Sequence, residues 1–225
     1  MLIPYNQSNF QAVIFDMDGV LIDSEPLWKL AMYDVFSSYG SSLNAQDFQR
    51  TVGLRIDQVV EFWNRESNWG IIDCTAVVNQ IIDCMVELVA KNPVPLPGVL
   101  ETLKYLNQTH MRIGLATSSP QRLIDAVLKH LNILHYFHAI HSAEYERYGK
   151  PHPDVYLKTA ESLGVNPSQC LVIEDSLNGV ISAKAAMMSV VCIPEKTHIP
   201  NPKLIIADYH FENMCDFLAD FRSSV

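Results

Sequence analysis

Two pairs of acidic residues are placed where they could act together in this 225-residue chain. Asp16 and Asp18 follow a short β-branched and aromatic segment, and Glu174 and Asp175 follow a second apolar segment. If both segments are neighbouring strands of a parallel sheet, the four carboxyl groups converge at the carboxyl ends of the strands, where open α/β folds bind ligands. Carboxylates so close together repel one another unless a cation neutralises them, and oxygen ligands suit Mg²⁺. The alternatives are a solvated turn for the first pair and acids decorating a helix N-terminus for the second.

A hydroxyl-rich segment and a constrained lysine could complete an anion site. Thr117 ends an apolar segment and is followed by Ser118, Ser119 and a proline that could open a helix. Hydroxyl and backbone N–H groups in such a place can hold phosphate oxygens, although plain helix capping by either serine is the alternative. Lys150 lies between a glycine and a proline. It could neutralise a phosphate and the acid pairs, whereas a lone lysine is usually a solvated surface charge.

Alternating strand and helix patterns position these residues. Apolar segments predict strands at 11–15, 112–117, 139–141, 170–174 and 189–193, with 205–207 as a further candidate. Helical patterns are predicted between them at 99–108, 121–131, 153–163 and 177–186. This alternation predicts an α/β fold, a Rossmann-like parallel sheet with helices on both faces.

The segment between the first two strands has a different character. It shows helical patterns at 27–39, 45–51, 56–67 and 75–91 and no strand pattern, and it ends in the proline-rich segment 92–98. We therefore expect a helical cap domain at 23–96, inserted into a core domain formed by 1–22 and 97–225.

Composition narrows the classes of partner and compartment. The net charge of −9 disfavours nucleic acid as a partner. Apolar segments fall short of the roughly 18 residues of a membrane span, and the opening segment lacks the pattern of a signal peptide. Five cysteines without a Cys-x-x-Cys pair indicate free thiols. We expect a cytoplasmic protein that does not bind membranes, and a monomer, because no coiled-coil pattern demands a partner.

The ordered motifs resemble those of the haloacid dehalogenase superfamily. In chain order they are Asp16-x-Asp18-Gly-Val, Thr117-Ser118, Lys150-Pro-His-Pro-Asp and Glu174-Asp175-Ser-x-Asn-Gly. With a helical insertion after the first motif, essentially the whole chain resembles the β-phosphoglucomutase-like branch. The segments Asp23-Ser-Glu-Pro-Leu-Trp28 and Thr51-Val-Gly-Leu-Arg55-Ile-Asp57 are similar to phosphatases of the hexitol phosphate and 2-deoxyglucose-6-phosphate group.

The resemblance implies a Mg²⁺-dependent phosphatase acting on a small phosphorylated sugar or sugar alcohol. Asp16 would be the nucleophile that forms an aspartyl-phosphate, and Asp18 would be the general acid and then the general base. Dehalogenases proper lack the second aspartate, so Asp18 favours phosphoryl transfer.

The remaining motif residues would support this chemistry. Mg²⁺ would be held by Asp16, the Asp18 carbonyl and Asp175, with Glu174 in support. Thr117 and Lys150 would stabilise charge on the phosphoryl oxygens, helped by the Ser118 backbone.

Substrate recognition is expected from the cap. Glu25, and Arg55 after Gly53, could reach sugar hydroxyls, with simple surface charge as the alternative. We expect Trp63 and Trp69 to pack within the cap, while for Trp28 both packing and sugar stacking stay open.

Two other functions are possible. In the mutases of this branch a histidine stands where this chain has Trp28. This difference favours a phosphatase, which releases phosphate to water, over a phosphosugar mutase. A phospho-aspartate signalling domain is a remote alternative, because such domains are about half this length and carry no cap.

Overall fold

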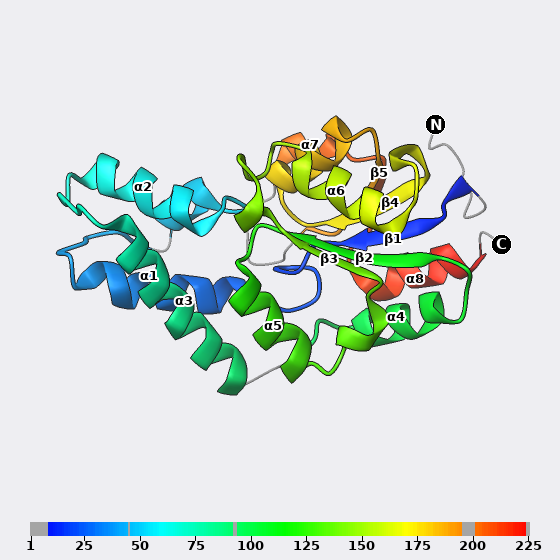
Figure 1. The fold of residues 1–225 in the computed structure, drawn as a ribbon, viewed down its shortest axis with the longest axis horizontal. Helices are drawn as coiled ribbons and strands as arrows, with labels where there is room; N and C mark the ends of the chain where they lie inside the picture. The colour runs from blue at the N-terminus through cyan, green and yellow to red at the C-terminus, as the bar shows by residue number, and fades with distance from the viewer. Residues whose placement is uncertain (1–8, 45, 92–93, 195–200, 224–225) are drawn as a thin grey trace.

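Six parallel strands form the centre of the molecule (Figure 1). The computed structural model describes residues 9–44, 46–91, 94–194 and 201–223. The strands are β1 (Ala12–Phe15), β2 (Arg112–Thr117), β3 (Ala139–Ser142), β4 (Cys170–Glu174), β5 (Ser189–Cys192) and β6 (Tyr209–His210), in the spatial order β3-β2-β1-β4-β5-β6. The α-helices are α1 (Glu25–Ser37), α2 (Ile56–Ser67), α3 (Cys74–Lys91), α4 (Val99–Asn107), α5 (Gln121–His130), α6 (Asp154–Leu163), α7 (Leu177–Ala185) and α8 (Met214–Ser223). The α/β fold expected from the sequence is confirmed.

Strand β1 lies between β2 and β4, which brings the motif-bearing strand ends together. Phe15 is level with Leu115 of β2 and with Ile173 of β4. Asp16, the next residue, is therefore flanked by the ends of both neighbouring strands. The reversal of strand order at β1 is the place where doubly wound sheets form their ligand crevice.

Alternate residues of the strands face two separate apolar layers. On one face of the sheet, Val13 and Phe15 of β1 belong to a cluster that includes residues of α4, α5 and α8. On the other face, Ala12 and Ile14 pack with residues of α6 and α7. In Figure 1 these two groups of helices lie on opposite sides of the strands. Because both faces of the sheet are covered, the sequences of its central strands are almost continuously apolar.

Helices α1, α2 and α3, which we call the cap helices, form a separate layer beyond the carboxyl edge of the sheet (Figure 1). The chain leaves and re-enters the sheet layer side by side, because the Leu96 N–H donates to the Leu21 carbonyl and Ile22 bridges Pro95. Helix α3 also packs against α5 of the sheet layer. A division into cap and core domains at residues 23 and 96 stays a prediction.

Three short elements differ from the sequence-based expectation. The helix expected at 45–51 is a 3₁₀-helix at Asp47–Thr51, and position 45 lies outside the described residues. The candidate strand at 205–207 is wrong, because this segment ends a 3₁₀-helix at Pro202–Ile206 and the edge strand β6 follows it. Helix α8 was not expected, although its buried face closes one apolar layer. Within the described residues, the helices are too short or too polar to span a lipid bilayer.

Candidate active site

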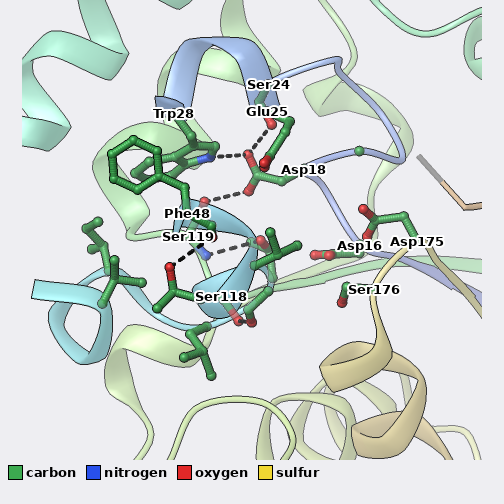
Figure 2. Close-up of a pocket in the computed structure, with 18 of the residues that line it drawn as sticks. Asp16, Asp18, Ser24, Glu25, Trp28, Phe48, Ser118, Ser119, Asp175 and Ser176 are labelled. Carbon is green, nitrogen blue, oxygen red and sulfur yellow. Dashed lines mark hydrogen bonds between the residues drawn. The ribbon is translucent and has the colours of Figure 1, made fainter. Parts of the chain in front are cut away.

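A pocket lies between the carboxyl edge of the sheet and the cap helices (Figure 2). Asp16, Asp18, Thr117 and Asp175 line its sheet side. Residues from α1, α2 and the connection between them line the opposite side. The pocket therefore joins the strand ends to the helical segment that the sequence assigned to substrate recognition.

Lys150 forms a buried ion-pair network with two carboxylates at the base of this site. Its ammonium nitrogen donates to Glu174 Oε1 at 2.7 Å and to the Ala116 carbonyl at 3.0 Å, and it lies 3.1 Å from Asp16 Oδ1. Burial alone would lower the pKa of Lys150, but Asp16 and Glu174 hold it above its ordinary value. The lysine is thus a fixed positive charge rather than a solvated surface group.

Glu174 has both of its oxygens occupied by protein donors. Oε1 accepts hydrogen bonds from Lys150 and from the Tyr156 hydroxyl, and Oε2 accepts from the Asp175 and Ser176 N–H groups and the Ser176 hydroxyl. Burial alone would raise the pKa of Glu174, yet the Lys150 ammonium and these hydrogen bonds bring it below its ordinary value. Glu174 is therefore an ionised partner of Lys150.

Tyr156 is a site residue that the sequence reasoning missed. Its hydroxyl lies 2.6 Å from Glu174 Oε1, and the Lys150 ammonium lies 4.8 Å from the centre of its ring. Burial and the nearby carboxylates raise the pKa of Tyr156 well above its usual value, so the hydroxyl remains a donor. Its place six residues after Lys150, on the inner face of α6, was the available signal.

Tyr156→Phe should destabilise the protein by about 1.5–3 kcal/mol, because a buried carboxylate loses a hydrogen bond while the ring is retained. Thr159→Val is the matched control, since it removes a buried hydroxyl from the same helix that donates to the Val155 carbonyl. That bond is neutral and should cost about 0.5–1.5 kcal/mol. Urea unfolding of both variants makes the comparison. Equal losses would mean that the Tyr156 hydroxyl has no special part in holding Glu174.

Asp18 is held by three donors from two parts of the fold (Figure 2). Its Oδ1 accepts from the Ser24 hydroxyl at 2.5 Å and from the Trp28 indole N–H at 2.9 Å, both next to or within α1. Its Oδ2 accepts from the Ser119 hydroxyl at 2.6 Å, after β2. The side chain of Asp18 therefore faces the cap helices rather than the acidic cluster.

Asp16, Glu174 and Asp175 form a buried cluster in which one oxygen from each lies within 4.8 Å of the others. Among the described residues, Asp16 Oδ1 is buried without a hydrogen-bond partner, although Lys150 is near it. Burial, opposed by Lys150, raises the pKa of Asp16 to about 7. Three clustered carboxyl groups beside one ammonium carry an excess of negative charge, and their oxygens suit a hard divalent cation.

The segment after β2 differs in part from the expectation. Thr117 is buried and its hydroxyl accepts from the Ser119 N–H, while the Ser118 hydroxyl donates to the Gly53 carbonyl. Neither serine caps α5, whose first N–H donates instead to Glu144. The contact from Ser119 to Asp18 was not anticipated.

Two glycines of the motifs are required by close approach. A Cβ at Gly19, where φ is +70°, would overlap the Asp175 carboxylate, and a Cβ at Gly179 would overlap that of Glu174. Gly19 of the first motif thus makes room for Asp175, and Gly179 makes room for Glu174.

The structure separates the expected cap residues into two groups. Glu25, Trp28 and Gly53 line the pocket, and Glu25 pairs with Lys29 at 3.1 Å. The guanidinium of Arg55 instead contacts Asp57 and two carbonyl groups of the sheet layer, and Arg55 is not among the residues that line the pocket.

The other two tryptophans pack within the cap helices. Trp63 meets Phe62 edge to face, and the ring of Trp69 lies 4.9 Å from that of Phe36. Neither is among the residues that line the pocket.

Comparison with known proteins agrees with this geometry. The family model described as haloacid dehalogenase-like hydrolase matches residues 13–193. Hexitol phosphatase B of Escherichia coli (strain K12) is 39% identical over 209 residues, covering 92% of this chain and 94% of that protein. Fructose-1-phosphate phosphatase of the same strain is 32% identical over 185 residues, covering 81% and 95%.

A solved structure shows the same fold. The β-phosphoglucomutase of Clostridium difficile superposes with a TM-score of 0.82 at 24% identity, covering 95% of this chain and 98% of that one. The resemblance drawn from the four motifs is confirmed by the extent of these matches. The chain belongs to the family of haloacid dehalogenase-like hydrolases.

Proposed function

We propose that this protein is a Mg²⁺-dependent phosphatase that hydrolyses phosphate monoesters of small sugars or sugar alcohols through an aspartyl-phosphate at Asp16. The observation that carries the proposal is the buried Asp16 carboxylate beside Lys150, in a pocket that Asp18 also lines and that the cap helices cover. The relatives named for hexitol phosphates and fructose 1-phosphate support the substrate class.

Asp16 forms the first new bond. Its carboxylate attacks phosphorus in line with the leaving oxygen, the bond from phosphorus to that oxygen breaks, and Asp18 gives the leaving alcohol a proton. Lys150 and Thr117 stabilise negative charge on the transferring oxygens. Asp16 and Asp175, with the Asp18 carbonyl, would hold Mg²⁺, which would supply positive charge to keep the nucleophile ionised and to offset the charge of the phosphate.

Water then hydrolyses the aspartyl-phosphate. Asp18 takes a proton from the attacking water, the bond between phosphorus and Asp16 breaks, and inorganic phosphate leaves. Oδ1 of Asp18 accepts two hydrogen bonds, whereas Oδ2 accepts one and keeps a lone pair that can carry the transferred proton. Glu174 touches neither reactant and acts by keeping Lys150 in place.

The cap side of the pocket suits a leaving group with both apolar and polar faces. Met32, Phe48 and Ile56 contribute apolar surface, and Glu25 and Trp28 lie beside them. A sugar or sugar alcohol offers C–H surface to the first group and hydroxyls to Glu25. A panel of phosphorylated hexitols, hexoses and short polyols, ranked by kcat/KM, tests this substrate class. Preference for a phosphorylated carboxylic acid would contradict it.

A mutase would use the same chemistry with a different outcome. Trp28 holds Asp18 through an N–H group that can only donate, and it stands where the mutases of this branch carry histidine. Assaying free phosphate and sugar phosphate isomers in one reaction separates the two functions. Isomer formation without phosphate release would overturn the phosphatase proposal.

Trp28→Phe should lower kcat for phosphate release roughly 10- to 100-fold, because it removes a hydrogen bond to the carboxylate of Asp18 and keeps an aromatic ring in the pocket. Trp69→Phe, the same change at a tryptophan that does not line the pocket, is the control and should leave kcat unchanged. A Trp28→Phe variant with the kcat of the native protein would show that Ser24 and Ser119 suffice to orient Asp18.

A further inference from the structure

The connection between the 3₁₀-helix Asp47–Thr51 and α2 is the place where the cap helices touch the loops of the site. The Val52 carbonyl accepts from the Asn178 side chain, and the Gly53 carbonyl accepts from the Ser118 hydroxyl. Gly53 adopts φ +76°, and a Cβ there would lie 2.9 Å from the Ser176 hydroxyl. The cap connection thus fits closely against the segments that follow β2 and β4.

Arg55 makes the most extensive of these contacts. Its Nε and Nη2 donate to the two carboxylate oxygens of Asp57, each at 2.7 Å. Its Nη1 donates to the carbonyls of Ala143 and Glu146, each at 2.8 Å. Four of the five N–H donors of the guanidinium are therefore used within the protein. The side chain is only 16% exposed, and the Asp57 contact raises the pKa of Arg55 further, so its charge is permanent.

The loop that Arg55 holds is connected to both phosphate-binding segments expected from the sequence. On one side of Ala143, the Ser142 hydroxyl donates to the Ser119 carbonyl. On the other side, the Glu144 carboxylate accepts from the first N–H of α5. Contacts made at Ala143 therefore reach the segment that carries Thr117.

The same loop leads directly to Lys150. Gly149, the residue before the lysine, lies under the cap: a Cβ there would be 3.1 Å from the Gln58 side chain and 3.3 Å from Arg55 Cβ. Glu146, whose carbonyl Arg55 holds, is fixed in turn by an ion pair with Lys158. A displaced Arg55 would thus release the loop at the point from which Lys150 enters the site.

We propose that Arg55 is a positioning residue that couples the seating of the cap helices to the placement of Lys150 and Thr117, and that it does not bind the sugar. The inference rests on the proposed phosphatase function. Two roles for Arg55 are thereby distinguished, namely binding the sugar and positioning the phosphate-binding residues. A residue that binds the sugar affects the leaving group, whereas a positioning residue affects the phosphoryl group. The two roles predict different dependence on the leaving group.

Arg55→Ala should weaken inhibition by inorganic phosphate and lower kcat/KM for both a hexitol phosphate and p-nitrophenyl phosphate by a similar factor, roughly 10- to 100-fold. The inhibition constant does not depend on how much enzyme is folded, so a merely destabilised variant would leave it unchanged. Arg55→Lys keeps one charge but cannot span a carboxylate and two carbonyls, and should give an intermediate loss.

Arg122→Ala is the matched control. Arg122 of α5 also bridges to the cap helices, through Asp83 of α3, but both side chains are more than half exposed, and neither is among the residues that line the pocket. Its removal should leave the phosphate inhibition constant unchanged.

Two results would overturn the proposal. A loss confined to the hexitol phosphate, with p-nitrophenyl phosphate and phosphate inhibition intact, would make Arg55 a sugar ligand. Unchanged phosphate inhibition and unchanged kcat/KM for both esters would show that the contact has no catalytic consequence. If the native protein hydrolyses p-nitrophenyl phosphate and no hexitol phosphate, the proposed substrate class fails, while the phosphate and p-nitrophenyl phosphate measurements still test Arg55.

Discussion

Replacing Asp16 with asparagine should lower kcat by more than about 10⁴-fold, because the amide cannot form the aspartyl-phosphate on which both half-reactions depend. The substitution keeps the size and shape of the side chain at a position that is 7% exposed and surrounded by Lys150, Glu174 and the ends of two strands. Steady-state phosphate release measures the loss. Appreciable residual turnover would show that another group is the nucleophile.

The same variant should be at least as stable as the native protein when the metal is removed. Burial raises the pKa of Asp16 from 3.8 in the unfolded chain to about 7 in the folded state. The folded state then binds the proton more tightly, so the free energy of unfolding falls as the pH rises from about 4 to about 7 and stays lower above that range. Asparagine does not ionise and removes this loss.

Urea unfolding in EDTA at pH 5 and pH 8 tests the sign of this effect. The advantage of Asp16→Asn over the native protein should be larger at pH 8. Asp125→Asn, the same change at an exposed residue of α5, is the control. If the advantage of Asp16→Asn over the native protein were smaller at pH 8 than at pH 5, burial would not be the cause of the raised pKa of Asp16.

The parts of the site that could be predicted from sequence are those fixed by strand ends. An acid directly after a buried strand lies at the carboxyl end of that strand, however the helices pack. The proximity of Asp16 and Glu174 therefore followed from the pairing of β1 with β4. The boundaries of α2 were equally predictable, because its apolar face recurs at helical spacing and an asparagine in the left-handed region ends it.

The contacts that hold the site depend instead on distances that no local pattern encodes. Ser119 reaches Asp18 across 101 residues, and Arg55 reaches Glu146 across 91. From its residue type, Arg55 could bind sugar hydroxyls. Its contacts with Asp57, Ala143 and Glu146 become visible only in the three-dimensional fold. Strand β6 and the 3₁₀-helix before it are too short for periodicity to tell them apart.

Removing Mg²⁺ should stop phosphate release, and adding it back should restore the full rate. Three buried carboxyl groups, those of Asp16, Glu174 and Asp175, face the single ammonium of Lys150. Once all three are ionised, their charge exceeds that of the Lys150 ammonium by two negative units before a phosphate dianion enters. A divalent cation matches that excess, and carboxylate oxygens are the ligands that suit it.

The metal should also stabilise the folded protein apart from any effect on rate. Binding to the folded state alone adds about 2.7 kcal/mol when free Mg²⁺ exceeds its dissociation constant a hundredfold. Thermal unfolding with and without Mg²⁺ measures this, and the gain should be larger at pH 8 than at pH 5, because a raised pKa leaves Asp16 protonated and unable to bind at the lower pH. In Asp175→Asn the gain should shrink strongly, since the ligand set loses a charge. Full activity in EDTA would refute the metal site, because Lys150 and the hydrogen bonds of the site would then neutralise the cluster without a cation. Equal stabilisation of the native and Asp175→Asn proteins would mean that Mg²⁺ binds elsewhere than at Asp175 and would refute the site as well.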